Sequence, residues 1–222
     1  MKTRKLLDKG TNIMTQPNEQ SFLKDVEKHE MRVLLQAGPY RHLLFVQPDT
    51  GNMWFEIITW PNKLTIAGDM GTWVFSRVED MFNFFRSPKL RIKPDYWGEK
   101  LQNGVFGGSS EAKKFDADAF KEEVLDSLTN WDLTPEQVQS VAQKLEDEVF
   151  QSSDYSQHEQ YRSLYDFSCD EGVKWDSEIP DGMVYRYHYI WCLYAIVWCI
   201  QQWDAKEQGT ARSALSRAKE AV

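Results

Sequence analysis

Several residue patterns that mark catalytic sites are missing from this sequence. Its four histidines and three cysteines show no metal-ligand spacing, and it contains no CxxC pair. The hydrolase elbow GxSxG, the phosphate-binding motifs GxxxxGK and GxGxxG, and the zinc motif HExxH are also absent. We therefore predict no catalytic residue, no metal site and no cofactor, and we favour a non-enzymatic protein over an enzyme.

Cysteine is scarce, which limits the role of disulfides. Only Cys169, Cys192 and Cys199 are present, and no apolar leader of about 7 residues follows the basic segment Met1–Lys9. This pattern is typical of reduced thiols in a cytoplasmic protein. The expectation is three buried, unpaired thiols.

Long apolar runs are also absent. The longest, YIWCLYAIVWCI at Tyr189–Ile200, has 12 residues, whereas a membrane-spanning helix needs about 20. Polar residues flank it on both sides, so we predict a core helix and no membrane span. His188, between two tyrosines at the start of this run, is expected to be a buried core histidine.

Basic residues are scarce in the second half of the chain. Residues 115–181 contain 4 Lys and Arg against 18 Asp and Glu, whereas residues 1–100 contain 15 against 12. A field this negative repels DNA and anionic membranes and favours a basic partner, so no direct DNA binding is expected. The alternative is a solvated helix surface that only keeps the protein in solution. The residues expected to bind a partner are Asp116, Asp118, Glu122, Glu123, Glu146, Asp147 and Glu148.

What the sequence does contain is a series of short apolar segments typical of an α+β fold. Aromatic and β-branched segments between turn residues predict a small antiparallel sheet of three to four strands packed with helices, followed by a mostly helical C-terminal half. The expected strands are 43–47, 53–60, 64–67 and 72–76. The expected helices are 21–38, 77–86, 116–130, 134–150, 154–167 and 183–203, with a polar helical tail over 204–222 that Gly209 interrupts.

A glycine-rich segment at 104–110 is the expected boundary within the chain. It separates an α+β region at 21–104, which follows a flexible N-terminus at 1–20, from an acidic helical region at 110–222. The two regions form either separate domains or one continuous domain. In the second region, Thr134 followed by Pro135 and Gln137 is typical of a capped helix start.

The segment GDMG at 68–71 interrupts an otherwise apolar stretch and has two interpretations. In the first it is only a tight turn or bulge, because glycine permits positive φ and Asp favours turns. In the second, Asp69 is a carboxylate at a strand end, surrounded by aromatic side chains that bind a base, a sugar or a cation. The residues of that second interpretation are Asp69, Trp54, Trp60, Trp73 and Arg77.

The segment RSPKLRIKPDYWGEK at 86–100 combines basic and aromatic residues. Such a combination binds single-stranded nucleic acid in some proteins. A second interpretation is that this basic segment meets the acidic half of another copy, which would give a homo-oligomer. The residues concerned are Arg86, Lys89, Arg91, Lys93 and Lys100, with Tyr96 and Trp97.

The block TIAGDMGTWVFSRVEDMFNFF at 65–85, with FEIITWP before it and KPDYWGEKL after it, resembles a block in uncharacterised proteins encoded by tailed bacteriophages and prophages. The resemblance covers about residues 40–101. It carries over no activity and no catalytic residue. It implies a phage accessory protein expressed in the cytoplasm of a bacterial host.

This context and the acidic charge together suggest a function. The leading hypothesis is a non-enzymatic inhibitor that binds a host anti-phage defence protein with a basic surface, such as a CRISPR effector or a restriction enzyme, as a nucleic-acid mimic. The contact face would be helices 116–130 and 134–150 with the acidic loop 168–182. The alternatives are a nucleotide-binding or small-molecule-binding protein with its site around Asp69, and a scaffold for other phage proteins.

Overall fold

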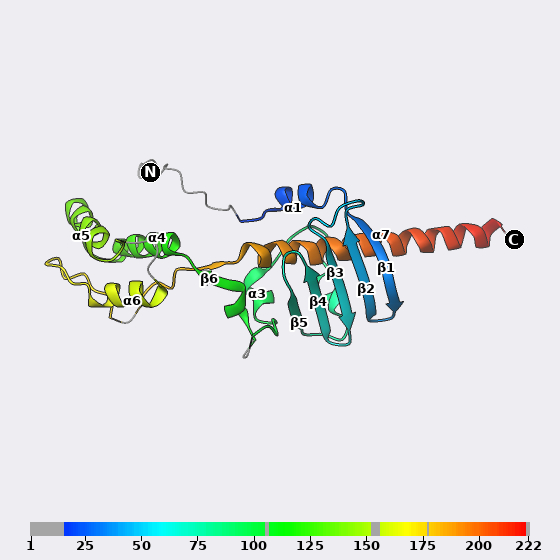
Figure 1. Ribbon diagram of the computed structural model, residues 1–222, viewed down its shortest axis with the longest axis horizontal. Coiled ribbons are helices and arrows are strands. Elements are labelled where there is room, and N and C mark those ends of the chain that lie inside the picture. Colours follow the sequence, from blue (N-terminus) through cyan, green and yellow to red (C-terminus); the bar gives the residue numbers. More distant parts are fainter. Residues whose placement is uncertain (1–15, 105–106, 152–155, 177, 221–222) are drawn as a thin grey trace. The chain divides into compact units, whose positions relative to one another are not determined.

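The computed structural model describes residues 16–104, 107–151, 156–176 and 178–220, with only the backbone described over 214–220. The fold is α+β, as the sequence predicts. It divides into two compact units, each described here by itself. Unit 1 comprises residues 1–112 and 186–222, and unit 2 comprises residues 113–185 (Figure 1).

The centre of unit 1 is an antiparallel sheet of five strands. Its strands follow one another in chain order, β1-β2-β3-β4-β5, so each neighbouring pair is joined by a short connection. The strands are β1 (Glu30–Ala37), β2 (Tyr40–Val46), β3 (Phe55–Trp60), β4 (Lys63–Gly68) and β5 (Trp73–Ser76). The last four correspond to the four predicted strands, with ends shifted by at most three residues.

One face of the sheet, here called the inner face, carries the core of unit 1. Alternate residues of the strands are fully buried there, including Leu43, Phe45, Ile57 and Phe75. These side chains pack against the long helix α7 (Tyr187–Glu220). For example, Phe55 meets Trp191 edge-on with 5.6 Å between ring centroids.

Short helices complete the packing around the inner face. The helices are α1 (Glu19–Asp25), α2 (Met81–Phe85) and α3 (Pro94–Gly98), with a 3-10 turn η1 (Ser109–Ala112). Phe22 of α1 contacts Trp191 at 5.1 Å, and Phe85 of α2 contacts Phe75 at 5.1 Å. Edge-to-face aromatic pairs of this kind each contribute about 1 kcal/mol beyond their buried area.

The predicted helix over 21–38 is wrong in its second half. Only α1 is helical there, held by a reciprocal capping box between Asn18 and Ser21. Residues 30–37 form β1 instead, because they pair with β2 across a turn at Gly38-Pro39. The helix also begins within the expected flexible segment 1–20, whose first fifteen residues lie outside the described part of the chain.

Helix α7 changes the expected domain division. We expected 183–203 to belong to the acidic region, but most of residues 189–200 are buried in the core of unit 1. The helix is continuous to Glu220, and Gly209 does not interrupt it. His188, in the first turn of α7, is exposed, contrary to the prediction. The neighbouring Tyr189 is the residue of this turn that is buried in the core.

Unit 2 is a small helical unit with its own core. Its helices are α4 (Ala117–Ser127), η2 (Leu128–Asn130), α5 (Pro135–Glu148) and α6 (Gln157–Asp166). They bury a cluster that includes Phe120, Val141, Leu145, Leu164 and Trp175. Its first and last segments, β6 (Lys113–Phe115) and β7 (Met183–Tyr185), pair as antiparallel strands. The chain therefore enters and leaves this unit at neighbouring points.

Candidate functional site

The most strongly charged surface belongs to unit 2. Its 73 residues carry 6 Lys and Arg against 18 Asp and Glu, a net charge of −12, whereas unit 1 has 20 against 16, a net charge of +4. The basic side chains that unit 2 has are largely occupied. Lys121 pairs with Glu146 at 2.6 Å, Lys174 pairs with Asp176 at 2.9 Å, and Lys144 donates to the carbonyl oxygen of Ser168 at 3.1 Å.

The structure divides the seven predicted partner-binding residues into two groups. Three of them hold unit 2 together. Asp116 caps α4 by accepting from the amide of Ala119, Glu123 accepts from the amide of Gly182 at 2.9 Å, and Glu146 pairs with Lys121. A carboxylate that already accepts a hydrogen bond or forms an ion pair within unit 2 is less available to bind a partner.

The other four predicted residues are exposed, as Glu123 is too, and Asp147 among them accepts from the Gln143 side chain at 3.2 Å. Asp118 and Glu122 lie one helical turn apart on α4, and Asp147 and Glu148 lie near the end of α5. The structure adds Asp126, which is exposed and continues the α4 stripe at the next i+4 position. The sequence contained this signal in the spacing 118, 122 and 126. We call the set Asp118, Glu122, Asp126, Asp147 and Glu148 the acidic surface.

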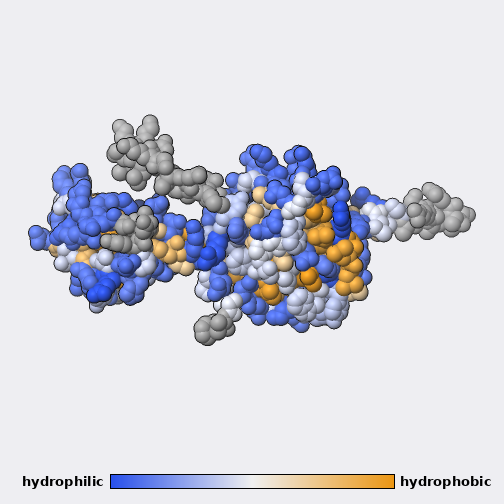
Figure 2. Space-filling view, in the orientation of Figure 1, coloured by the Kyte–Doolittle hydropathy of each residue, from blue (hydrophilic) through white to orange (hydrophobic). Residues whose placement is uncertain are grey.

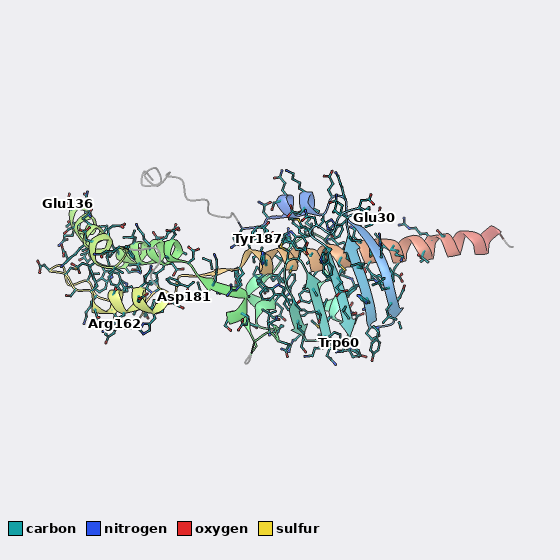
Figure 3. All side chains as sticks on the ribbon, in the orientation of Figure 1. Glu30, Trp60, Glu136, Arg162, Asp181 and Tyr187 are labelled. Carbon is teal, nitrogen blue, oxygen red and sulfur yellow. The ribbon has the colours of Figure 1, made fainter. Side chains whose placement is uncertain are left out.

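The acidic loop 168–182 is anchored to the core of unit 2. Val173 and Trp175 are buried, and the Trp175 indole donates to the Ser127 hydroxyl at 3.2 Å. Asp170 and Glu178 remain exposed. The loop therefore presents carboxylates from a fixed backbone over its described residues. Figure 3 shows Glu136, Arg162 and Asp181 at the rim of this unit.

The predicted site around Asp69 is not assembled. The amide of Asp69 donates to the carbonyl oxygen of Trp54 at 3.1 Å, so these two lie at one end of the sheet, where Trp73 is also located. Trp60 is the last residue of β3 and Arg77 follows β5, so both lie at the other end of the sheet. In Figure 3, Trp60 and Glu30 lie at opposite ends of the sheet. Glu30 pairs with Val46, which lies at the same end of the sheet as Asp69.

The GDMG segment is the turn between β4 and β5. The amide of Gly71 donates to the carbonyl oxygen of Gly68 at 2.9 Å. Gly68 has φ 151°, and a Cβ there would lie 2.2 Å from the Trp54 carbonyl oxygen. The carbonyl oxygen of Met70 accepts from the Trp73 indole. The backbone thus requires glycine at 68 and favours it at 71, where φ is 86°, whereas Asp69 and Met70 contribute only backbone groups to these hydrogen bonds.

An open pocket of about 750 Å³ lies at the other end of the sheet. Arg41 lies in its wall and is nine-tenths buried. The Arg41 guanidinium donates two hydrogen bonds to the Asp80 carboxylate, of 3.0 and 2.8 Å. Its guanidinium is 4.4 Å from the Phe82 ring centroid, and its Nε has no hydrogen-bond partner. Asn83, Phe84 and Tyr96 line the same pocket. No sequence pattern pointed to it, because its lining comes from three separate segments.

Two groups of ionisable residues have shifted pKa values with clear causes. Burial opposes ionisation of Asp80, but hydrogen bonds from Arg41 and from the Phe82 amide outweigh it and lower the pKa of this carboxyl group. Burial raises the pKa of the Cys192 and Cys199 thiols, so both stay protonated at neutral pH. All three cysteines are unpaired, and Cys169 is only half-buried.

The basic segment 86–100 keeps most of its charges exposed, including Lys89, Arg91 and Lys93, but only part of its aromatic character. Trp97 is buried, and Arg86 pairs with Asp204 of α7 at 2.8 Å. Lys100 pairs with Glu99 and lies over the Tyr96 ring. Only Tyr96 of the two aromatic residues is exposed, so the segment lacks the series of stacking rings that single-stranded nucleic acid requires.

The chain is thus an α+β protein with a helical acidic unit inserted between η1 and α7. Within the described ranges, no group of three His, Cys, Asp or Glu residues is arranged to hold a metal ion. Over the same residues, no helix is both long and apolar enough to cross a membrane. In comparisons with known proteins, no family model, curated protein or solved structure matches this chain.

Proposed function

We propose that this protein is a non-enzymatic binding protein whose acidic surface occupies a basic surface of another protein. The observation that carries the proposal is the separation of charge between the units, −12 against +4, with the acidic side chains exposed on helices. Complementary charge increases the rate of encounter and disfavours partners of the wrong sign. The same sign argues against a nucleic acid as the partner.

The partner that we propose is a bacterial anti-phage defence protein with a basic, nucleic-acid-binding surface. This choice rests on the resemblance of residues 40–101 to phage accessory proteins, and on the geometry of carboxylates repeated at i, i+4 on α4. Such a stripe presents negative charge at intervals of about 6 Å along a helix, similar to the phosphate spacing of a nucleic-acid strand.

The test is capture of the tagged protein's partner from bacterial lysate at low and high salt. Capture of a defence protein at low salt, weakened at high salt, is expected. The variant Asp118→Lys, Glu122→Lys, Asp147→Lys and Glu148→Lys should reduce capture at least tenfold. A matched variant, Glu27→Lys, Asp49→Lys, Asp69→Lys and Glu79→Lys, changes net charge equally at exposed positions of unit 1. Equal loss in both variants would contradict the assignment to this surface.

A second candidate function is binding of a small molecule in the pocket beside Arg41. The observation that favours it is the buried Arg41 Nε, a donor without an acceptor in the wall of a pocket that also contains two aromatic rings. A planar ligand with acceptor groups, such as a nucleotide, fits that lining. Calorimetric titration with nucleotides tests it, with Tyr96→Ala expected to weaken binding and Asp69→Ala expected to leave it unchanged.

A further inference from the structure

The face of the sheet opposite α7, here called the outer face, carries a group of exposed apolar residues. Leu35, Tyr40 and Trp60 are 50%, 50% and 38% exposed, and Leu44, Ile58 and Val74 are half-buried on the same face. Figure 2 shows apolar side chains gathered over β1 and β2. Scattered apolar residues are ordinary on a surface, but a contiguous patch usually marks a contact.

Nothing in the described part of unit 1 packs on this patch. In the described part of the chain, the ring contacts and hydrogen bonds between helices and sheet involve inner-face residues, such as Phe45 with Trp198 and Gln36 with Glu207. The two edges of the sheet also differ. At β5, the Asn103 side chain accepts from the Val74 amide and the Lys100 carbonyl accepts from the Ser76 amide. Among the described residues no comparable hydrogen bonds cover the β1 edge, and a bulge there leaves Leu34 55% exposed.

The strand register places the outer-face residues of β1, β2 and β3 in rows that run across the sheet. Each row is complementary to the same row of a second copy that faces it in the opposite order. In one row Arg32 of β1 lies beside Leu44 of β2, which lies beside Glu56 of β3. The row therefore has a positive end, an apolar centre and a negative end, where the Glu56 carboxylate also bonds the His42 ring at 2.6 Å. In the next row Leu35, His42 and Ile58 are neighbours in the same order. This row is apolar at both ends.

We propose that the outer face is the interface of a two-fold symmetric dimer of this chain. A two-fold axis that runs along β2, between two facing sheets, places β1 of each copy over β3 of the other. Arg32 of one copy then faces Glu56 of its partner, and Leu35 faces Ile58. Leu44 packs against its own symmetry mate at the centre. This arrangement buries the exposed aliphatic side chains and gives Arg32 an opposite charge in Glu56, whose carboxylate also bonds the His42 ring.

In the proposed interface, the effect of a substitution on dimerisation depends on how far its strand lies from β2. Strands lie about 4.8 Å apart, so Arg32 and Glu56 are about 10 Å apart within one copy and form no direct pair there. Val74, on β5, lies beyond the overlap of β1, β2 and β3. It belongs to the same face and has similar burial, so Val74→Lys is a matched control for Ile58→Lys.

The experiment is sedimentation equilibrium of the full chain from about 1 to 100 µM. A dimer is expected. Ile58→Lys should shift it to monomer, whereas Val74→Lys should leave it intact, with circular dichroism as the check on folding. Arg32→Glu and Glu56→Arg should each weaken the dimer about tenfold, and the double variant should regain most of the loss.

Three results would overturn the proposal. They are a monomer at every concentration, equal effects of Ile58→Lys and Val74→Lys, and no recovery in the double charge-exchange variant. The outcome is independent of the proposed function, because every substitution lies in unit 1 and the acidic surface lies in unit 2.

Discussion

At the scale of single residues, the question raised by GDMG has a structural answer. Gly68 is required because the Trp54 backbone lies where a side chain would be, whereas Asp69 is exposed and its backbone alone makes a contact. We expect Gly68→Ala to lower the free energy of unfolding by about 3 kcal/mol and Asp69→Ala to change it by less than about 0.5 kcal/mol. Chemical denaturation measures both. A strongly destabilising Asp69→Ala would show that its carboxylate has a role in the fold.

Asp80 should make stability depend on pH in the acid range. Its folded-state pKa is lowered, so its contribution is present above the pKa of the unfolded state, about 3.9, and is lost as pH falls through the folded-state value. Asp80→Asn leaves the buried Arg41 with weaker partners and should cost about 2 kcal/mol at pH 7. As pH falls below the unfolded-state pKa of about 3.9, the difference between variant and wild type should shrink. Thermal melts at pH 7 and pH 3 measure it, and a constant difference would contradict the assignment.

The three thiols should react at different rates with a thiol reagent at neutral pH. Cys192 and Cys199 are buried and their pKa values are raised, whereas Cys169 is half-buried. One thiol per chain should therefore react about a hundredfold faster than the other two, because the latter require opening of the core. Mass spectrometry of the labelled peptides identifies which cysteine has reacted. Rapid labelling of Cys192 would show that α7 is less firmly packed than the structure indicates.

At the scale of elements, local signals set the helices of unit 2. The predicted start at Thr134 is confirmed: Thr134 accepts from the Gln137 amide, Gln137 reaches back, and Pro135 takes the first helical position. We expect Thr134→Ala to lower the free energy of unfolding by about 1 kcal/mol, since one amide of the first turn loses its acceptor. Thr134→Ser serves as the control, because serine retains the hydroxyl, and urea unfolding compares the two.

Other elements did not follow their local signals. The apolar residues of 30–37 fit a helix as well as a strand, and pairing with β2 decided for the strand. Helix α7 passes through Gly209 even though glycine costs about 1 kcal/mol in a helix interior. The pocket beside Arg41 has no sequence signal, because its lining is brought together only by the turn at Gly38-Pro39, by α2 and by α3.

At the scale of the whole molecule, unit 2 is an insertion in unit 1. The amide of Arg186, where the chain returns, donates to the carbonyl oxygen of Ala112, where it leaves, at 2.8 Å. Replacing residues 113–185 by a glycine-serine linker of about four residues should therefore leave unit 1 folded, with one cooperative thermal transition. Aggregation of this variant, with loss of its near-ultraviolet circular dichroism, would show that unit 1 needs the insertion.

The same variant separates the two proposals. It retains the outer face and lacks the acidic surface, so it should still dimerise but no longer capture a basic partner. Loss of both properties in a folded variant would mean that one surface serves both functions.

The sequence by itself determined the α+β class, four of the five strands of the sheet, the capped start of α5 and the acidic character of 115–181. These features depend on local turn chemistry, on periodicity and on composition, which act over a few residues. Only the tertiary structure decided that α7 belongs to the sheet, that Trp60 and Asp69 lie at opposite ends, and that three of the seven predicted carboxylates hold unit 2 together. Those outcomes depend on pairing and burial between distant segments, which no local pattern records.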